Sequence, residues 1–174
     1  MIEKKFLFSP GPVMTSERVK STLLHPDMCH RRPMFEQVLK RVRNNLLSLF
    51  DANDAYTAVV VSGSGTAANE TALSSIIKEG EAVLLIKNGE FGERLAEILT
   101  CYKYRLHLLD YAWGAYPDTA EVRKTLEDNP EIRWVCMVYH ETSTGMINPV
   151  RRIGEITKSL HKNYFVDCVS AVGG

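Results

Sequence analysis

The stretch from Arg133 to Val166, RWVCMVYHETSTGMINPVRRIGEITKSLHKNYFV, decides the fold. Two apolar segments, Arg133 to Tyr139 and Tyr164 to Val166, flank a helical pattern from Val150 to His161, which Pro149 precedes as a helix start prefers. Apolar residues recur in that pattern at spacings of three and four and form one buried stripe: Val150, Ile153, Ile156 and Leu160. The strand, helix, strand order predicts a βαβ unit with parallel strands.

The same alternation continues toward the amino terminus. The expected strands are Tyr56 to Val61, Ala82 to Ile86 and Arg105 to Leu109. The expected helices are Thr66 to Lys78, Phe91 to Tyr102 and Thr119 to Asp128. The pattern therefore predicts an α/β fold, with a mostly parallel sheet and helices on both of its faces.

Residues 1–50 follow a different pattern. The turn-rich stretch FSPGPVMTSERV comes first, and an amphipathic helix is predicted from about Pro33 to Phe50. One face of this helix is apolar and carries Phe35, Val38, Leu39, Val42, Leu46 and Leu49. Residues 1–50 thus form a leader ahead of the alternating region. Two interpretations stay open: the leader packs on a second domain or subunit, or it covers one face of the same sheet.

Composition excludes several classes of function. The 174 residues carry 21 basic and 21 acidic side chains, so the balanced charge predicts no nucleic-acid or anionic-membrane partner. No run of about 18 apolar residues could span a membrane, and we expect a cytoplasmic protein. The four cysteines form no CxxC pair and the histidines no HxxxH pattern, so no metal site is predicted.

A glycine-containing loop lies in the stretch VVVSGSGTAANETAL, from Val59 to Leu73. Backbone N–H groups and hydroxyls at the start of the following helix favour an anion, phosphate above all. The alternative is a tight turn in which Ser64 or Thr66 is the N-cap. Both interpretations stay open on the loop alone.

The loop also matches the dinucleotide pattern GxGxxG/A through Gly63, Gly65 and Ala68. A dinucleotide domain needs an acidic residue at the end of the next strand to hold the ribose. Here that strand ends in Lys87, Asn88 and Gly89, so this interpretation is rejected. A P-loop is also rejected, because no Gly-Lys-Ser/Thr follows.

Asp167 stands at the carboxyl end of the last predicted strand, where open α/β sheets place ligand-binding groups. It either pairs with the protonated ring nitrogen of a pyridine cofactor or caps the loop that follows. Hydroxyls gather at the same edge in ETSTG, from Glu141 to Gly145, and Phe91 follows another strand there. A phosphate site, an aromatic plate, hydroxyl donors and an acid together match pyridoxal phosphate.

Five stretches then resemble a known family: SPGPVMT, GSGTAANE, NGEFGER, ETSTGMINP and VDCVSAVGG. In order and spacing they are similar to the class V aminotransferases, pyridoxal-phosphate enzymes of fold type I, over essentially the whole chain. The stretch ETSTGMINPVRRIG most resembles the 2-aminoethylphosphonate:pyruvate transaminases of that family. The alanine:glyoxylate and serine:pyruvate aminotransferases share the framework and are the alternatives.

The resemblance implies a role for individual residues. The pyridoxal 5'-phosphate group would be bound by three residues of the glycine loop: Ser64, Gly65 and Thr66. Phe91 would stack on the pyridine ring, and Thr142 would hydrogen-bond near the ring hydroxyl or the acid. Asp167 would be the catalytic acid that pairs with the ring nitrogen, and Gly11 would hold the substrate carboxylate. Family members usually carry a histidine where this chain has Tyr139.

The resemblance also implies a domain organisation. Residues 1–50 would be the leader, and residues 51–174 the first part of the cofactor-binding large domain, without its remainder or the small domain. The Schiff-base lysine of the family would lie beyond Gly174, and neither Lys78 nor Lys87 is expected to replace it. We therefore expect the amino-terminal half of a homodimeric transaminase acting on an amino donor and a 2-oxo acid. The alternative of another class is a non-catalytic fragment.

Overall fold

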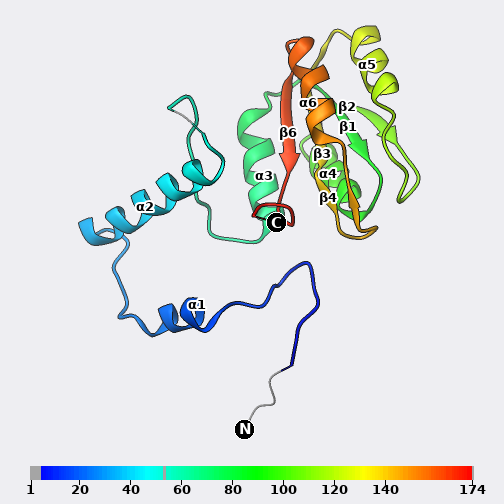
Figure 1. The fold of residues 1–174 in the computed structure, drawn as a ribbon. Helices are drawn as coiled ribbons and strands as arrows, with labels where there is room; N and C mark the ends of the chain where they lie inside the picture. The colour runs from blue at the N-terminus through cyan, green and yellow to red at the C-terminus, as the bar shows by residue number, and fades with distance from the viewer. Residues whose placement is uncertain (1–4, 53, 174) are drawn as a thin grey trace. The chain divides into compact units, whose positions relative to one another are not determined.

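The computed structural model describes residues 5–52 and 54–173. The chain divides into two compact units, residues 1–62 and residues 63–172, and Gly173 groups with the first. The second unit holds the sheet and all of its helices (Figure 1). In the part of the chain that is described, no helix is long and apolar enough to cross a membrane.

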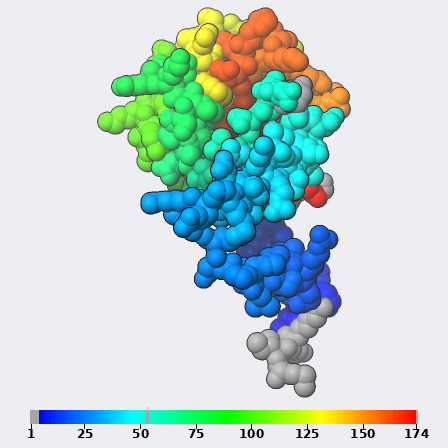
Figure 2. All heavy atoms as spheres, turned by 90° about the vertical axis from the view of Figure 1, so that its left-hand side faces the viewer, coloured from blue at the N-terminus to red at the C-terminus, as the bar shows by residue number. Residues whose placement is uncertain are grey.

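The first unit is helical and contains little buried surface. Its elements are α1 (Glu17–Ser21), the short 3-10 helix η1 (Thr22–Leu24) and α2 (Pro33–Leu49), and none of the three contains a buried residue. The described residues before α2, blue in Figure 2, are exposed except for the half-buried Ser9. The amphipathic helix is confirmed, and its apolar residues Val42, Leu46 and Leu49 are exposed within this unit.

The second unit is built on four parallel strands. They are β1 (Ala82–Lys87), β2 (Arg105–Asp110), β3 (Ile132–Val138) and β6 (Asn163–Asp167), in the order β2-β1-β3-β6. The register pairs Val138 with Asp167, so the ends of β3 and β6 lie side by side. A separate antiparallel hairpin follows β3 and consists of β4 (His140–Glu141) and β5 (Met146–Ile147).

Helices cover both faces of this sheet, because successive strand residues point to opposite sides. On one face α5 (Thr119–Asp128) and α6 (Val150–Ser159) pack against Ala82, Leu84 and Ile86 of β1. On the other face α3 (Gly65–Ile76) and α4 (Glu90–Cys101) pack against Val83 and Leu85. The predicted α/β class, mostly parallel sheet and two helical layers are therefore confirmed.

One predicted strand is wrong. Residues 56–61 have no regular secondary structure and pair with no strand in the described chain, and they lie in the first unit, outside the sheet. Tyr56 and Val59 are 66% and 78% exposed, so the apolar β-branched run that predicted a buried strand buries little surface here. Composition alone does not tell a buried strand from an extended segment, because strand propensity depends on packing against neighbours.

Candidate active site

Asp167 ends β6 with its carboxylate held from two sides. The side chain is 7% exposed. Its Oδ2 accepts a hydrogen bond from Asn69 Nδ2 of α3 at 2.6 Å, and its Oδ1 accepts one from the Val169 N–H at 2.9 Å. Each carboxylate oxygen can accept two hydrogen bonds, so the acid is oriented and still has capacity for a further donor.

The N-terminus of α3 has both an N-cap side chain and unpaired N–H groups, the two features that the sequence left as alternatives. Ser64 is the N-cap, and its hydroxyl accepts a hydrogen bond from the Ala67 N–H at 3.2 Å. Within the described residues the N–H groups of Gly65 and Thr66 have no acceptor. The helix therefore has a local cap and two free donors, which suit an anion.

A close approach brings this helix start to the loop that follows Asp167. A Cβ atom on Gly65 would lie 2.8 Å from the side chain of Val169, so only glycine leaves room for the loop in its observed position. Asn69, one turn further along α3, makes its hydrogen bond to Asp167. The predicted phosphate-binding loop and the predicted acid thus lie together.

The ETSTG loop lies beside the loop after β6. Ser170 Oγ donates to the His140 carbonyl at 3.1 Å, and His140 Nδ1 lies 3.3 Å from the Ser170 carbonyl oxygen. The Tyr139 N–H donates to the Asp167 carbonyl at 2.8 Å. Thr142 is half-buried, and its hydroxyl has no partner among the described residues.

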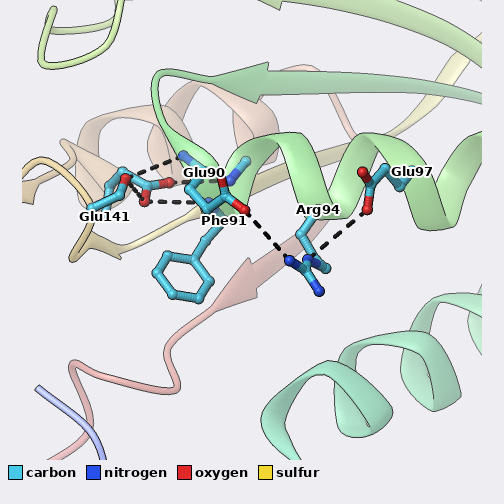
Figure 3. Close-up of polar contacts among 7 residues, drawn as sticks. Glu90, Phe91, Arg94, Glu97 and Glu141 are labelled. Atoms are coloured by element: carbon cyan, nitrogen blue, oxygen red, sulfur yellow. Dashed lines mark hydrogen bonds and ion pairs between the residues drawn. The ribbon is translucent and has the colours of Figure 1, made fainter.

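Phe91 is the second residue of α4, and its N–H donates to Glu141 of the ETSTG loop. The residue is 42% exposed, and its ring points away from Glu141, whereas its backbone turns toward that carboxylate (Figure 3). Four of the seven predicted cofactor and substrate residues therefore lie at the starts of α3 and α4: Ser64, Gly65, Thr66 and Phe91. Thr142 lies in the ETSTG loop, and Asp167 is the last residue of β6. Gly11 belongs to the first unit, and its role stays a prediction.

The buried polar residues that were not assigned a role from the sequence include Asn69, Asn88, Glu141 and Asn148. Asn69 and Leu73 are the buried residues of α3, one helical turn apart. An amide side chain within the apolar stripe of a helix indicates, from sequence alone, a buried hydrogen bond, because a buried amide needs a partner. Glu141 is fully buried, and Asn88 pairs with Asn148 through two amide hydrogen bonds of 2.8 and 3.2 Å. These contacts fix the loops that follow β1 and β3.

Lys87 forms two ion pairs at the carboxyl end of the sheet. Lys87 lies at the end of β1, and its Nζ is 2.8 Å from Asp110 Oδ1 and 3.7 Å from Glu93 Oε1. It therefore has an acidic partner on the neighbouring strand, away from Asp167. Burial, with a smaller contribution from the charge of Asp167, raises the pKa of the Cys168 thiol. This cysteine is therefore a poor nucleophile at neutral pH.

The sequence profile described as Aminotransferase class-V matches residues 14–174. The chain belongs to the class V aminotransferase family. It is 39% identical over 172 residues to an uncharacterised aminotransferase of Methanocaldococcus jannaschii, covering 98% of this chain and 44% of the relative. It is 38% identical to a 2-aminoethylphosphonate–pyruvate transaminase of Syntrophobacter fumaroxidans, covering 97% and 45%. The chain thus spans under half the length of these class V relatives.

The structure is also similar to that of solved aminotransferases. Against the ureidoglycine–glyoxylate aminotransferase of Bacillus subtilis, the TM-score is 0.89 at 31% identity, covering 95% of this chain and 42% of the other. The mostly parallel sheet with its helices is therefore the fold of this family.

The cofactor of class V aminotransferases is pyridoxal phosphate, and the residues of this chain fit it. The free N–H groups of Gly65 and Thr66 suit its phosphate. The oriented carboxylate of Asp167 suits a protonated ring nitrogen. The exposed ring of Phe91 offers an apolar face to a heterocycle.

Proposed function

We propose that the complete protein transfers the amino group of 2-aminoethylphosphonate to pyruvate and gives phosphonoacetaldehyde and alanine. The observation that carries this proposal is the identity of 38% and 36% to two 2-aminoethylphosphonate–pyruvate transaminases over 97% of the chain. Pyruvate and alanine carry the carboxylate for which Gly11 is proposed. The protein would act as a cytoplasmic homodimer.

The second-unit residues would have separate tasks. Gly65 and Thr66 would bind the cofactor phosphate through their N–H groups, together with the hydroxyls of Ser64 and Thr66. Phe91 would limit the tilt of the pyridine ring, and Thr142 would donate a hydrogen bond near it. Pyridoxal phosphate supplies an electron sink for the bond that breaks at the amino-bearing carbon.

Asp167 would hold a proton on the ring nitrogen of the cofactor. Its carboxylate is buried and already accepts one hydrogen bond at each oxygen, so it cannot turn to solvent without losing both. A charge-assisted hydrogen bond to the ring nitrogen would contribute about 1.5 to 3 kcal/mol. Asn69 and the Val169 N–H would orient the carboxylate without neutralising it.

The alternative is an alanine- or serine-dependent aminotransferase that uses glyoxylate or pyruvate as acceptor. The likeness to the ureidoglycine–glyoxylate aminotransferase at 31% identity favours it as the second candidate. None of the cofactor-facing residues proposed here discriminates between amino donors, because all of them would contact the cofactor. Donor and acceptor must therefore be compared by kinetics.

The test is a substrate panel with the complete, cofactor-loaded protein. Each of 2-aminoethylphosphonate, alanine and serine is paired with pyruvate and with glyoxylate, and kcat/KM is measured. We expect the highest value for 2-aminoethylphosphonate with pyruvate. A higher value for alanine or serine with glyoxylate would instead establish the alternative.

A matched pair of variants tests the acid in the same assay. Asp167→Ala should lower kcat by about ten- to a hundredfold, the factor that corresponds to one charge-assisted hydrogen bond. Asp128→Ala removes an exposed carboxylate at the end of α5 and should leave kcat unchanged. Equal activity of both variants would contradict the role of Asp167.

A further inference from the structure

Helix α4 begins without a cap of its own. Its N-cap residue is Gly89, which has no side chain to accept a hydrogen bond from the first turn. A carboxylate from a distant part of the chain takes that place: Glu141 Oε1 accepts from the Phe91 N–H at 3.3 Å, and Oε2 from the Gly92 N–H at 3.1 Å (Figure 3). Its negative charge also lies at the positive end of the helix dipole.

Ser143 extends this contact to the third N–H of the turn. Its hydroxyl donates to Glu141 Oε1 at 2.5 Å and accepts from the Glu90 N–H at 3.1 Å. All three leading N–H groups of α4 are therefore paired with two side chains of the ETSTG loop.

The fit between these segments is close. A Cβ atom on Gly89 would overlap the side chains of Glu141 and Ser143. Gly89 has φ of 175°, which is extended backbone that any residue adopts, so contact with these side chains is what requires glycine. Glu141 is fully buried and forms no ion pair in the described part of the chain. The helix start is its compensating partner.

Phe91 is the second residue of this helix, so the cap determines where its ring stands. The Phe91 N–H donates to Glu141, whereas the ring points away from that carboxylate, and the residue stays 42% exposed (Figure 3). Thr142 follows Glu141 directly in the chain. One carboxylate therefore links the residue proposed to stack on the cofactor ring with the residue proposed to hydrogen-bond beside it.

We propose that Glu141 is a positioning residue for the cofactor, which acts by holding the first turn of α4 and with it the ring of Phe91. The inference rests on the proposed function, because it takes Phe91 as the residue against the pyridine ring. Glu141 itself would not touch the cofactor, since its carboxylate is enclosed by the helix start and Ser143.

The test is Glu141→Gln in the complete protein. The change keeps the volume of the side chain but replaces one acceptor oxygen with an NH2 group, which would face an N–H donor of the turn. The matched control is Glu97→Gln on the same helix, where the side chain is 73% exposed and makes only a 3.9 Å ion pair with Arg94. Both substitutions remove one negative charge from α4 or its cap.

Three measurements are made on each protein. Hydrogen exchange of the Phe91 and Gly92 amides, measured without cofactor, reports whether their hydrogen bonds to Glu141 are formed. The dissociation constant for pyridoxal phosphate and the visible circular dichroism of the bound cofactor report the position of the ring. In Glu141→Gln we expect about tenfold faster exchange and about tenfold weaker binding, the factor for one hydrogen bond to a charged group, with a changed dichroic band. Glu97→Gln should match the wild type in all three.

Two results would overturn the inference. Unchanged amide exchange would show that Glu141 does not cap α4, and faster exchange with unchanged affinity and dichroism would make it a structural cap only. If Glu141→Gln does not fold, Ser143→Ala keeps the carboxylate and should move all three readouts in the same direction by less, and no movement would overturn the inference. A wild type that binds no pyridoxal phosphate would overturn the proposed function as well, which distinguishes that failure from the failure of this inference alone.

Discussion

Helices α3 and α4 lie on the same face of the sheet and both begin after a glycine-containing loop, yet their N-termini differ. At α3 the local cap Ser64 satisfies one donor, and the N–H groups of Gly65 and Thr66 stay free. At α4 the cap is Glu141, which lies some fifty residues further along the chain, and no leading donor stays free.

The difference shows how one structural feature serves two purposes. A helix N-terminus has unpaired donors and a positive dipole end, and it is stabilised by any anion that reaches it. The chain supplies its own buried carboxylate to α4, so the leading N–H groups of that turn are closed to a ligand, and we propose that the turn holds Phe91 in place. It supplies only a hydroxyl to α3, so that turn stays available for a phosphate.

The largest expected effect comes from a pair of glycine substitutions, one at each helix start. Gly89→Ala places a methyl group against the Glu141 and Ser143 side chains, and the fully buried Glu141 has no room to move aside. We expect a loss of about 3 kcal/mol of unfolding free energy, the upper part of the range for overpacking. Gly65→Ala meets only Val169, which is 64% exposed and can shift, and should cost about 1 kcal/mol.

The measurement is the denaturant midpoint of each variant of the complete protein without cofactor. Equal midpoints for Gly89→Ala and Gly65→Ala would mean that the α4 cap is no more rigid than the α3 start. Cofactor affinity separates the two sites further, because Gly65→Ala should also weaken phosphate binding at the free donors.

Sequence patterns predicted the fold and one of these helix starts. The periodicity from Val150 to Leu160 and the glycine loop around Gly65 are local, so the βαβ unit and the open N-terminus follow from neighbouring residues. The cap of α4 and the contact of Asn69 with Asp167 join residues 49 to 98 positions apart. Such pairs leave no periodic signal, and only the folded chain shows them.

The second effect concerns Asn69, which joins α3 to the acid. Asn69→Ala removes a buried hydrogen bond to a carboxylate and should lower the unfolding free energy by about 1.5 to 3 kcal/mol. It should also weaken pyridoxal phosphate binding, because Asp167 would keep only the Val169 N–H as an orienting donor. Denaturation and cofactor titration measure the two losses.

Ser74→Ala is the matched control for this effect, since it removes an exposed hydroxyl of the same helix that donates to the Thr71 carbonyl. It should leave both stability and cofactor affinity close to those of the wild type. If Asn69→Ala lowers stability but not affinity, Asn69 supports the packing of α3 on the sheet and Asp167 needs no second orienting donor.

The smallest effect tests whether the α3 cap belongs to the anion site. Ser64→Ala removes the hydroxyl that accepts from the Ala67 N–H, and Asp118→Ala removes the equivalent cap of α5, where Asp118 Oδ1 accepts from the Ala120 N–H at 2.8 Å. Each should cost about 1 kcal/mol of unfolding free energy, the usual value for an N-cap. Only Ser64→Ala should also weaken pyridoxal phosphate binding, because only at α3 do free donors adjoin the cap. Equal affinities would mean that the two free N–H groups bind the phosphate without the hydroxyl, and the contrast with α4 would then rest on backbone donors alone.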